Sequence, residues 1–195
     1  MNNALIILAG GMGKRLDKSN KTPKQFIKFQ TYEPFRYAST SDMERFQRVS
    51  SFSLSNEEFV LLSKEAESLG IGFFSTPLDE SSVQFVSSIS PVIKIASPDM
   101  NFEPTVRAAA STGKPLIIST GMANKQEISE AIDVIQNKGN HDIIIMHCIT
   151  SYPTKPEDAN LEMIRTLQSE FPENIIGFSD HTLGTDIAVF STFYG

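Results

Sequence analysis

Disulfide pairs, tryptophan and long apolar runs are absent from this sequence of 195 residues. Cys148 is the one cysteine, so no disulfide can form within the chain. The first apolar run, residues 4–9, is too short for a membrane span or a signal peptide. These absences predict a cytoplasmic protein that does not bind a membrane.

Positive charge is also scarce. The chain has 17 basic and 23 acidic residues, a net charge of −6, and no block of basic residues. Nucleic-acid binders concentrate basic residues on one face, so this composition argues against a nucleic-acid partner. Any phosphate that binds here must be held by a few local groups. With 40% hydrophobic residues, the chain can bury one full core.

Apolar runs of strand length recur along the chain, and they cover residues 4–8, 26–30, 71–74, 92–96, 116–118, 143–146 and 175–178. Helical patterns lie between them. Ser55 with Glu58, and Asn124 with Glu127, have the spacing of capping boxes that begin helices. Residues 30–55 lack a clear period and predict a long loop with a short helix near residues 42–49. Strands that alternate with helices predict βαβ units and a parallel sheet.

Hydroxyl, carboxylate and imidazole groups gather where four of these runs end. One run continues into Ser179-Asp180-His181, and the others end near Ser97, Ser119 and Ser151. An α/β barrel carries its chemistry at the carboxyl ends of its strands. A closed barrel has eight strands and about 250 residues. We therefore expect an α/β fold, a partial TIM-type (β/α) barrel whose last strand is missing.

From about residue 27 to residue 188 the sequence resembles the N-acetylneuraminate (sialic acid) synthase family and its legionaminate and pseudaminate relatives. The resemblance is carried, in order, by KFQT at 28–31, GIGFFSTPLD at 70–79, KIAS at 94–97, GKPLIISTGM at 113–122 and SDHTLG at 179–184.

Residues 1–26 resemble a different group, the sugar-nucleotide and cytidylyl transferases, through LAGGMGKRL at 8–16 and TPKQF at 22–26. We therefore expect a fusion: a nucleotidyltransferase-like fragment, 1–26, whose strand, loop and helix replace the first β/α unit, and a truncated synthase-like barrel domain, 27–195. The resemblance implies nucleotide binding by Gly10, Gly11, Gly13, Arg15 and Lys24. The alternative is that this unit only fills the place of the first barrel strand, with glycine making the tight turn.

The synthase resemblance implies condensation of phosphoenolpyruvate with an N-acetylated sugar, assisted by a divalent metal, Mn²⁺ or Mg²⁺. It implies catalytic roles for Lys28, Gln30 and Lys94, and a metal ligand in His181. Phosphoenolpyruvate or its phosphate would be bound by Lys28, Thr76, Lys94, Ser97, Ser119, Ser151 and Ser179.

Local chemistry supports some of these roles and leaves alternatives open. Lys28 and Gln30 are two residues apart and share one strand face, and a lysine inside an apolar strand is costly unless it meets an anion. The alternatives are a solvated linker lysine at 28 and a sheet-edge lysine at 94. The serines alone are typical turn serines. His181 alone is a poor metal site, and the alternative is a loop histidine bonded to a neighbouring carboxylate.

The family's first strand with its glutamate, its last strand with a second histidine, and its C-terminal antifreeze-like domain find no match in the sequence. We therefore expect weak metal binding, impaired turnover, and a homodimer formed through unpaired strand edges. Two other functions stay open. One is a nucleotidyltransferase-related protein, favoured if the N-terminal loop binds CTP; the other is a non-catalytic phosphate-binding fragment, favoured if metal binding is absent.

Overall fold

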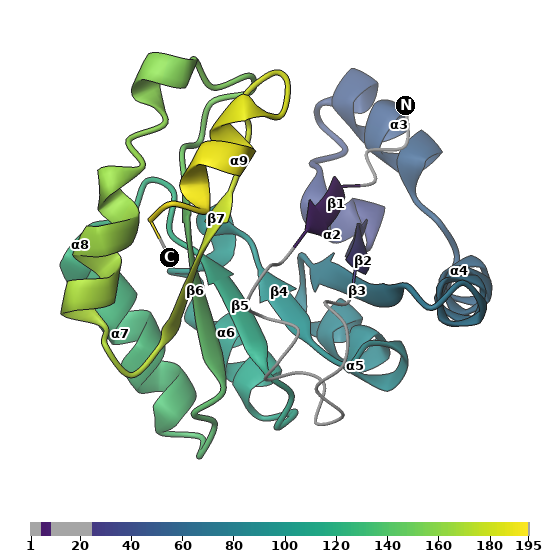
Figure 1. Cartoon of the computed structure of the whole chain (residues 1–195). Helices are drawn as coiled ribbons and strands as arrows, with labels where there is room; N and C mark the ends of the chain where they lie inside the picture. Colours follow the sequence, from purple (N-terminus) through teal and green to yellow (C-terminus); the bar gives the residue numbers. More distant parts are fainter. Residues whose placement is uncertain (1–4, 9–24, 195) are drawn as a thin grey trace. The chain divides into compact units, whose positions relative to one another are not determined.

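Strands and helices alternate in the computed structural model, which describes residues 5–8 and 25–194 (Figure 1). In this part of the chain the strands are β1 (Leu5–Leu8), β2 (Gln25–Thr31), β3 (Gly72–Pro77), β4 (Ile93–Ile95), β5 (Leu116–Ser119), β6 (Ile143–Cys148) and β7 (Ile175–Ser179). Each overlaps one of the apolar runs, so the predicted strands and the α/β class are confirmed.

The helices lie between these strands. They are α2 (Pro34–Tyr37), α3 (Met43–Phe52), α4 (Asn56–Ser68), α5 (Glu80–Ile89), α6 (Glu103–Ala110), α7 (Lys125–Gln136), α8 (Glu162–Glu170) and α9 (Asp186–Ser191), with 3₁₀ turns at Ser97–Asp99 and Pro156–Asp158. Both predicted capping boxes are present, at the starts of α4 and α7. The helix predicted near 42–49 is α3, capped by Asp42. Within the described ranges, no helix has the length and apolarity to cross a bilayer.

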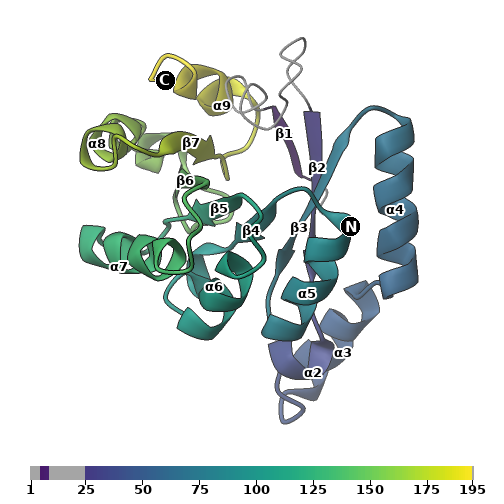
Figure 2. The ribbon, with the colours of Figure 1, turned by 90° about the horizontal axis from the view of Figure 1, so that it is seen from below.

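The chain divides into two compact units, Met1–Lys94 and Ile95–Gly195. In the first unit β2, β3 and β4 are parallel, and α4 and α5 pack against β3 (Figure 2). β1 lies beside β2, as the sequence predicts, but it runs antiparallel, whereas every strand of a TIM barrel is parallel. The predicted domain boundary at residue 26 falls inside β2 and stays a prediction.

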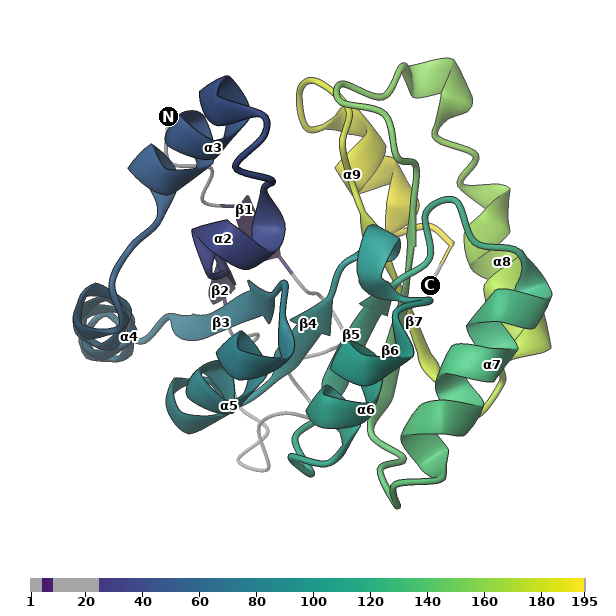
Figure 3. The same ribbon diagram turned by 180° about the vertical axis from the view of Figure 1, so that it is seen from behind.

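In the second unit β5, β6 and β7 form consecutive parallel pairs. Helix α8 packs on β6 and β7, and α6 lies beside α7 (Figure 3). Residues 116–118 and 143–146 are fully buried, which explains why these strands are continuous apolar runs in the sequence.

Side-chain alternation gives the strands of the first unit two different faces. Ile27, Phe29 and Phe73 pack with Phe59 of α4 in an apolar cluster on the helix side. Residues one position along each strand point to the opposite side. That opposite side carries the polar residues that the sequence singled out.

Candidate active site

Four predicted site residues share one face of β2, β3 and β4. Paired residues of parallel strands point to the same side, and β2 pairs with β3 through Lys28 with Phe74 and Gln30 with Thr76. β3 pairs with β4 through Ser75 and Ile93, which places Lys94 on the side of Thr76. We call this set the lysine face: Lys28, Gln30, Thr76 and Lys94.

Both lysines of this face are shielded from water, Lys94 more fully than Lys28. Lys94 is only 6% exposed, and its neighbours Ile93 and Ile95 are fully buried. Lys28 is half-buried, and desolvation lowers its pKa below the usual value for lysine. Burying a cation costs free energy unless an opposite charge compensates it. Lys28 lies within β2, hydrogen-bonded to β3, so it is not a linker residue.

Thr76 adds a neutral hydroxyl to the same face. Its side chain is 1% exposed, and its Oγ1 has no hydrogen-bond partner within the described residues. Thr31, which points to the opposite side, bonds the Ser75 hydroxyl at 2.7 Å. Buried hydroxyls are nearly always paired, so a hydroxyl without a described partner, on the same face as two lysines, fits a ligand oxygen. Two ammonium groups and a hydroxyl suit phosphate and carboxylate groups.

A second cluster lies at the strand ends of the other unit. The backbone N–H of Gly121 donates to Ser97 Oγ at 3.0 Å, and Ser97 Oγ lies 3.2 Å from the Cys148 thiol. A methyl group on Gly121 would collide with the Thr150 hydroxyl. Glycine is therefore required here by close approach. Sequence reasoning did not identify this role of Gly121, although its position directly after two hydroxyl residues was a signal.

The predicted serines of this unit differ in their surroundings. Ser119 and Ser179 are buried at the carboxyl ends of β5 and β7, and Ser179 pairs with Cys148 of β6. Ser151 is exposed and donates to the Pro153 carbonyl in the following loop, as a turn serine does. The predicted phosphate contacts of Ser97, Ser119, Ser151 and Ser179 stay predictions.

His181 is held by the loop after β6. Its Nδ1 lies 2.6 Å from the Ile149 carbonyl, and its ring packs on Tyr152 with centroids 4.1 Å apart. A carbonyl only accepts, so Nδ1 carries the proton, and in the neutral ring the lone pair is on Nε2. Metal-binding histidines commonly have this arrangement. However, the described residues contain no group of three or more potential metal-binding side chains.

His147 points away from Ser119 and Cys148. It alternates with Cys148 along β6, bonds the Ala159 carbonyl at 2.9 Å through Nε2 and packs against Phe178. Desolvation lowers the pKa of His147, and this effect is larger than the opposing effect of its backbone hydrogen bonds. His147 therefore fixes the loop after β6.

The predicted nucleotide-binding residues Gly10, Gly11, Gly13, Arg15 and Lys24 lie outside the described residues.

Asp79, which the sequence reasoning did not single out, joins the loops after β2 and β3. Its carboxylate accepts from the backbone N–H groups of Glu33 at 3.0 Å and Ser82 at 2.9 Å, and from the hydroxyls of Ser81 and Ser82. Burial alone would raise the pKa of Asp79, but these hydrogen bonds outweigh burial and lower it. Asp79 thus fixes the loop that follows Lys28 and Gln30.

These features define a class: an α/β protein of parallel β/α units with buried cations and strand-end hydroxyls suited to anionic ligands. The chain belongs to the NeuB family, whose sequence profile matches residues 16–195.

An uncharacterised protein of Methanocaldococcus jannaschii is 45% identical over 97% of this chain and 59% of its own length. The N,N'-diacetyllegionaminic acid synthase of Legionella pneumophila is 36% identical over 81% of this chain and 49% of its own length. Among solved structures, the N-acetylneuraminic acid synthetase of Leptospira borgpetersenii, in complex with citrate, is 34% identical with a TM-score of 0.82, covering 87% of this chain and 59% of that one. The chain thus spans about half to three fifths of these proteins.

Proposed function

We propose that the chain binds phosphoenolpyruvate on the lysine face and acts as a nonulosonic acid synthase. Such an enzyme condenses phosphoenolpyruvate with an N-acetylated sugar. The observation that carries this proposal is the shared face of Lys28, Lys94 and the partnerless hydroxyl of Thr76. Phosphoenolpyruvate has one carboxylate and one phosphate, so it supplies two anionic groups to two lysines. Charge-assisted contacts of this kind contribute about 1.5–3 kcal/mol each.

The relatives support the same chemistry. The Legionella relative is named as a synthase of diacetyllegionaminic acid, and the Leptospira neighbour is named as a sialic acid synthetase and holds citrate, a polycarboxylate. In our proposal Lys28 and Lys94 neutralise the ligand's negative charges, and Thr76 donates to one of its oxygens. Gln30, on the same side of β2 as Lys28, presents an amide to the sugar.

We further propose that Mn²⁺ or Mg²⁺ binds weakly, with His181 as its ligand. The tautomer set by the Ile149 carbonyl fits this role, but the described side chains do not complete a metal shell. A bound divalent ion would polarise the sugar aldehyde. With so few protein ligands for the metal among the described residues, we expect a turnover number far below about 10 s⁻¹, the median value for enzymes.

A colorimetric assay for nonulosonic acid, with Mn²⁺, phosphoenolpyruvate and N-acetylmannosamine, tests the proposal. Product that Lys94→Met abolishes supports the synthase. Phosphoenolpyruvate binding without product favours the second candidate, a non-catalytic phosphate-binding protein. The lack of a group of three metal-binding side chains among the described residues also supports that candidate. Product formed equally by Lys94→Met would contradict the role given to the lysine face.

A further inference from the structure

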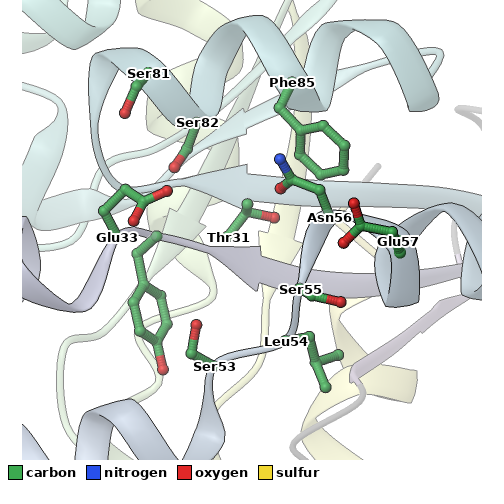
Figure 4. A pocket seen from close by; sticks show the side chains of 11 residues that line it. Thr31, Glu33, Ser53, Leu54, Ser55, Asn56, Glu57, Ser81, Ser82 and Phe85 are labelled. Carbon is green, nitrogen blue, oxygen red and sulfur yellow. The ribbon is translucent and has the colours of Figure 1, made fainter.

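A separate pocket of about 500 Å³ lies in the first unit (Figure 4). Its walls come from the end of β2 and the loop after it, the start of α4, and the first half of α5. The lining residues are Thr31, Tyr32, Glu33, Ser53, Leu54, Ser55, Asn56, Glu57, Ser81, Ser82 and Phe85. Its volume is within the range of small-molecule sites.

This pocket is on the helix side of β2. Thr31 lines it, and Thr31 alternates with Gln30 and bonds Ser75, which also points away from the lysine face. The side chains of Lys28 and Gln30 point to the other side of the strand. The pocket is therefore a different place from the proposed phosphoenolpyruvate site.

Among the residues that the structure describes, the lining has no lysine, arginine or histidine, but it has the two exposed carboxylates of Glu33 and Glu57. Phosphate and carboxylate ligands are disfavoured by this charge. Acceptors are plentiful: the hydroxyl protons of Ser81 and Ser82 are donated to Asp79, which leaves their oxygen lone pairs for a ligand. Donors come from the Asn56 amide and from first-turn N–H groups of α4 and α5, apart from those of Glu58 and Ser82, which already donate to Ser55 and Asp79.

Phe85 and Leu54 supply apolar side chains to the lining, and Phe85 adds an aromatic ring. Its ring lies beside Asn56 in Figure 4 and contacts Phe59 with centroids 6.1 Å apart, so it is held by the core. A sugar ring has C–H groups that pack on such a ring and a rim of hydroxyls that both donate and accept. Because Asp79 fixes Glu33, Ser81 and Ser82, the polar rim is preorganised, which reduces the entropy lost on binding.

We infer that this pocket binds a neutral N-acetylated sugar at a second site, apart from the lysine face. An N-acetyl group fits because its amide pairs with both the donors and the acceptors of the lining. The inference goes beyond the proposed function and does not require it, since no residue of the lysine face takes part.

An NMR titration of the ¹⁵N-labelled chain with N-acetylmannosamine tests this inference. We expect saturable shifts in the amides of residues 31–33, 53–57 and 81–85. Glu57→Gln removes a charged acceptor and should weaken binding about tenfold. Glu67→Gln makes the same change on α4 outside the pocket and should leave the affinity unchanged. Lys28→Met should also leave it unchanged, which separates this site from the phosphoenolpyruvate proposal.

Three outcomes would overturn the inference. They are the absence of saturable shifts in these amides, equal affinity in the Glu57→Gln and Glu67→Gln variants, and shifts caused by spermidine but not by the sugar. The last result would identify a site for cations that uses the carboxylates alone. Both substitutions are at exposed helix positions, so loss of folding is not expected.

Discussion

We expect Lys28 and Thr76 each to lower the stability of the folded chain in the absence of a ligand. Lys28 has a lowered pKa because its ammonium is desolvated, and the Thr76 hydroxyl is buried with no partner among the described residues. Residues that lower stability commonly mark functional sites, where the ligand supplies the missing interaction. Substitutions at these two positions should therefore change stability and binding in opposite directions.

Replacing Thr76 with valine removes a buried hydroxyl that has no partner among the described residues, and it keeps the shape of the side chain. We expect the free energy of unfolding to stay the same or to rise by up to about 1 kcal/mol, because no hydrogen bond is lost. The affinity for phosphoenolpyruvate should fall about five- to tenfold. Urea denaturation and calorimetry measure the two effects.

Thr31→Val is the matched control for this variant. It breaks the bond to Ser75, so it should lower the free energy of unfolding by about 1 kcal/mol while phosphoenolpyruvate binding is kept. If Thr76→Val behaves like Thr31→Val, then Thr76 has a structural role and the account of the lysine face is wrong at this residue.

Lys28→Met should stabilise the chain at pH 7. Because the folded pKa of Lys28 is lowered, the unfolded state binds the proton more tightly, and the cost of burying the charged form is fully present below the folded pKa. Methionine removes that cost, and we expect a gain of about 1 kcal/mol at pH 7 that disappears as the pH rises to the unfolded value of 10.5. Denaturation at pH 7 and pH 10 checks this. A loss of stability at pH 7 would show that the ammonium is already well compensated.

Some of these site residues can be identified from the sequence alone, and others cannot. Lys94 was identifiable because a lysine between apolar neighbours in a strand is unusual. The orphaned hydroxyl of Thr76 was not identifiable as such, because it depends on the register between β2 and β3. The same holds for Gly121, whose need for a glycine comes from Thr150, far along the chain.

At the scale of elements, short sequence patterns predicted the features that depend only on interactions between residues close together in the chain. The capping boxes at Ser55 and Asn124 formed because each needs only four consecutive residues. Helix α2 was missed because a single turn has no period to detect. The antiparallel direction of β1 was also missed, since strand direction depends on pairing with β2 and not on the residues of β1.

Asp79 connects two loops, and its effect on stability should depend on pH. Its folded pKa is lowered below 3.8, so its stabilising contribution is complete above the unfolded pKa and is lost as the pH falls through the folded one. We expect Asp79→Asn to lower the free energy of unfolding by about 1–2 kcal/mol at pH 7. The difference from the wild type should shrink toward pH 3.

Denaturation curves of both proteins between pH 3 and pH 7 measure this difference. Glu80→Gln, which neutralises the next, exposed carboxylate, is the control and should have little effect. A difference between Asp79→Asn and the wild type that is constant over this pH range would contradict the proposed role of the carboxylate charge.

At the scale of the whole molecule, the chain is a NeuB family member with two compact units. The strands β2–β4 of the first unit and β5–β7 of the second are parallel, and β1 is antiparallel to β2. The motifs of the sequence pointed to this family before the fold was known, because strand-end residues are short local patterns. The division at residue 94 was not predicted. It reflects the density of contacts between residues distant in sequence, which a single sequence does not display.

The central claim is that the lysine face binds phosphoenolpyruvate, and calorimetric titration of the 195-residue chain tests it most directly. Lys94→Met keeps the length and burial of the side chain but removes its charge, whereas Lys64→Met makes the same change at an exposed position of α4. We predict saturable binding to the wild type and to Lys64→Met, and affinity at least about tenfold weaker in Lys94→Met with its fold retained by circular dichroism. Equal binding by the two variants, or no binding to the wild type, would contradict the claim.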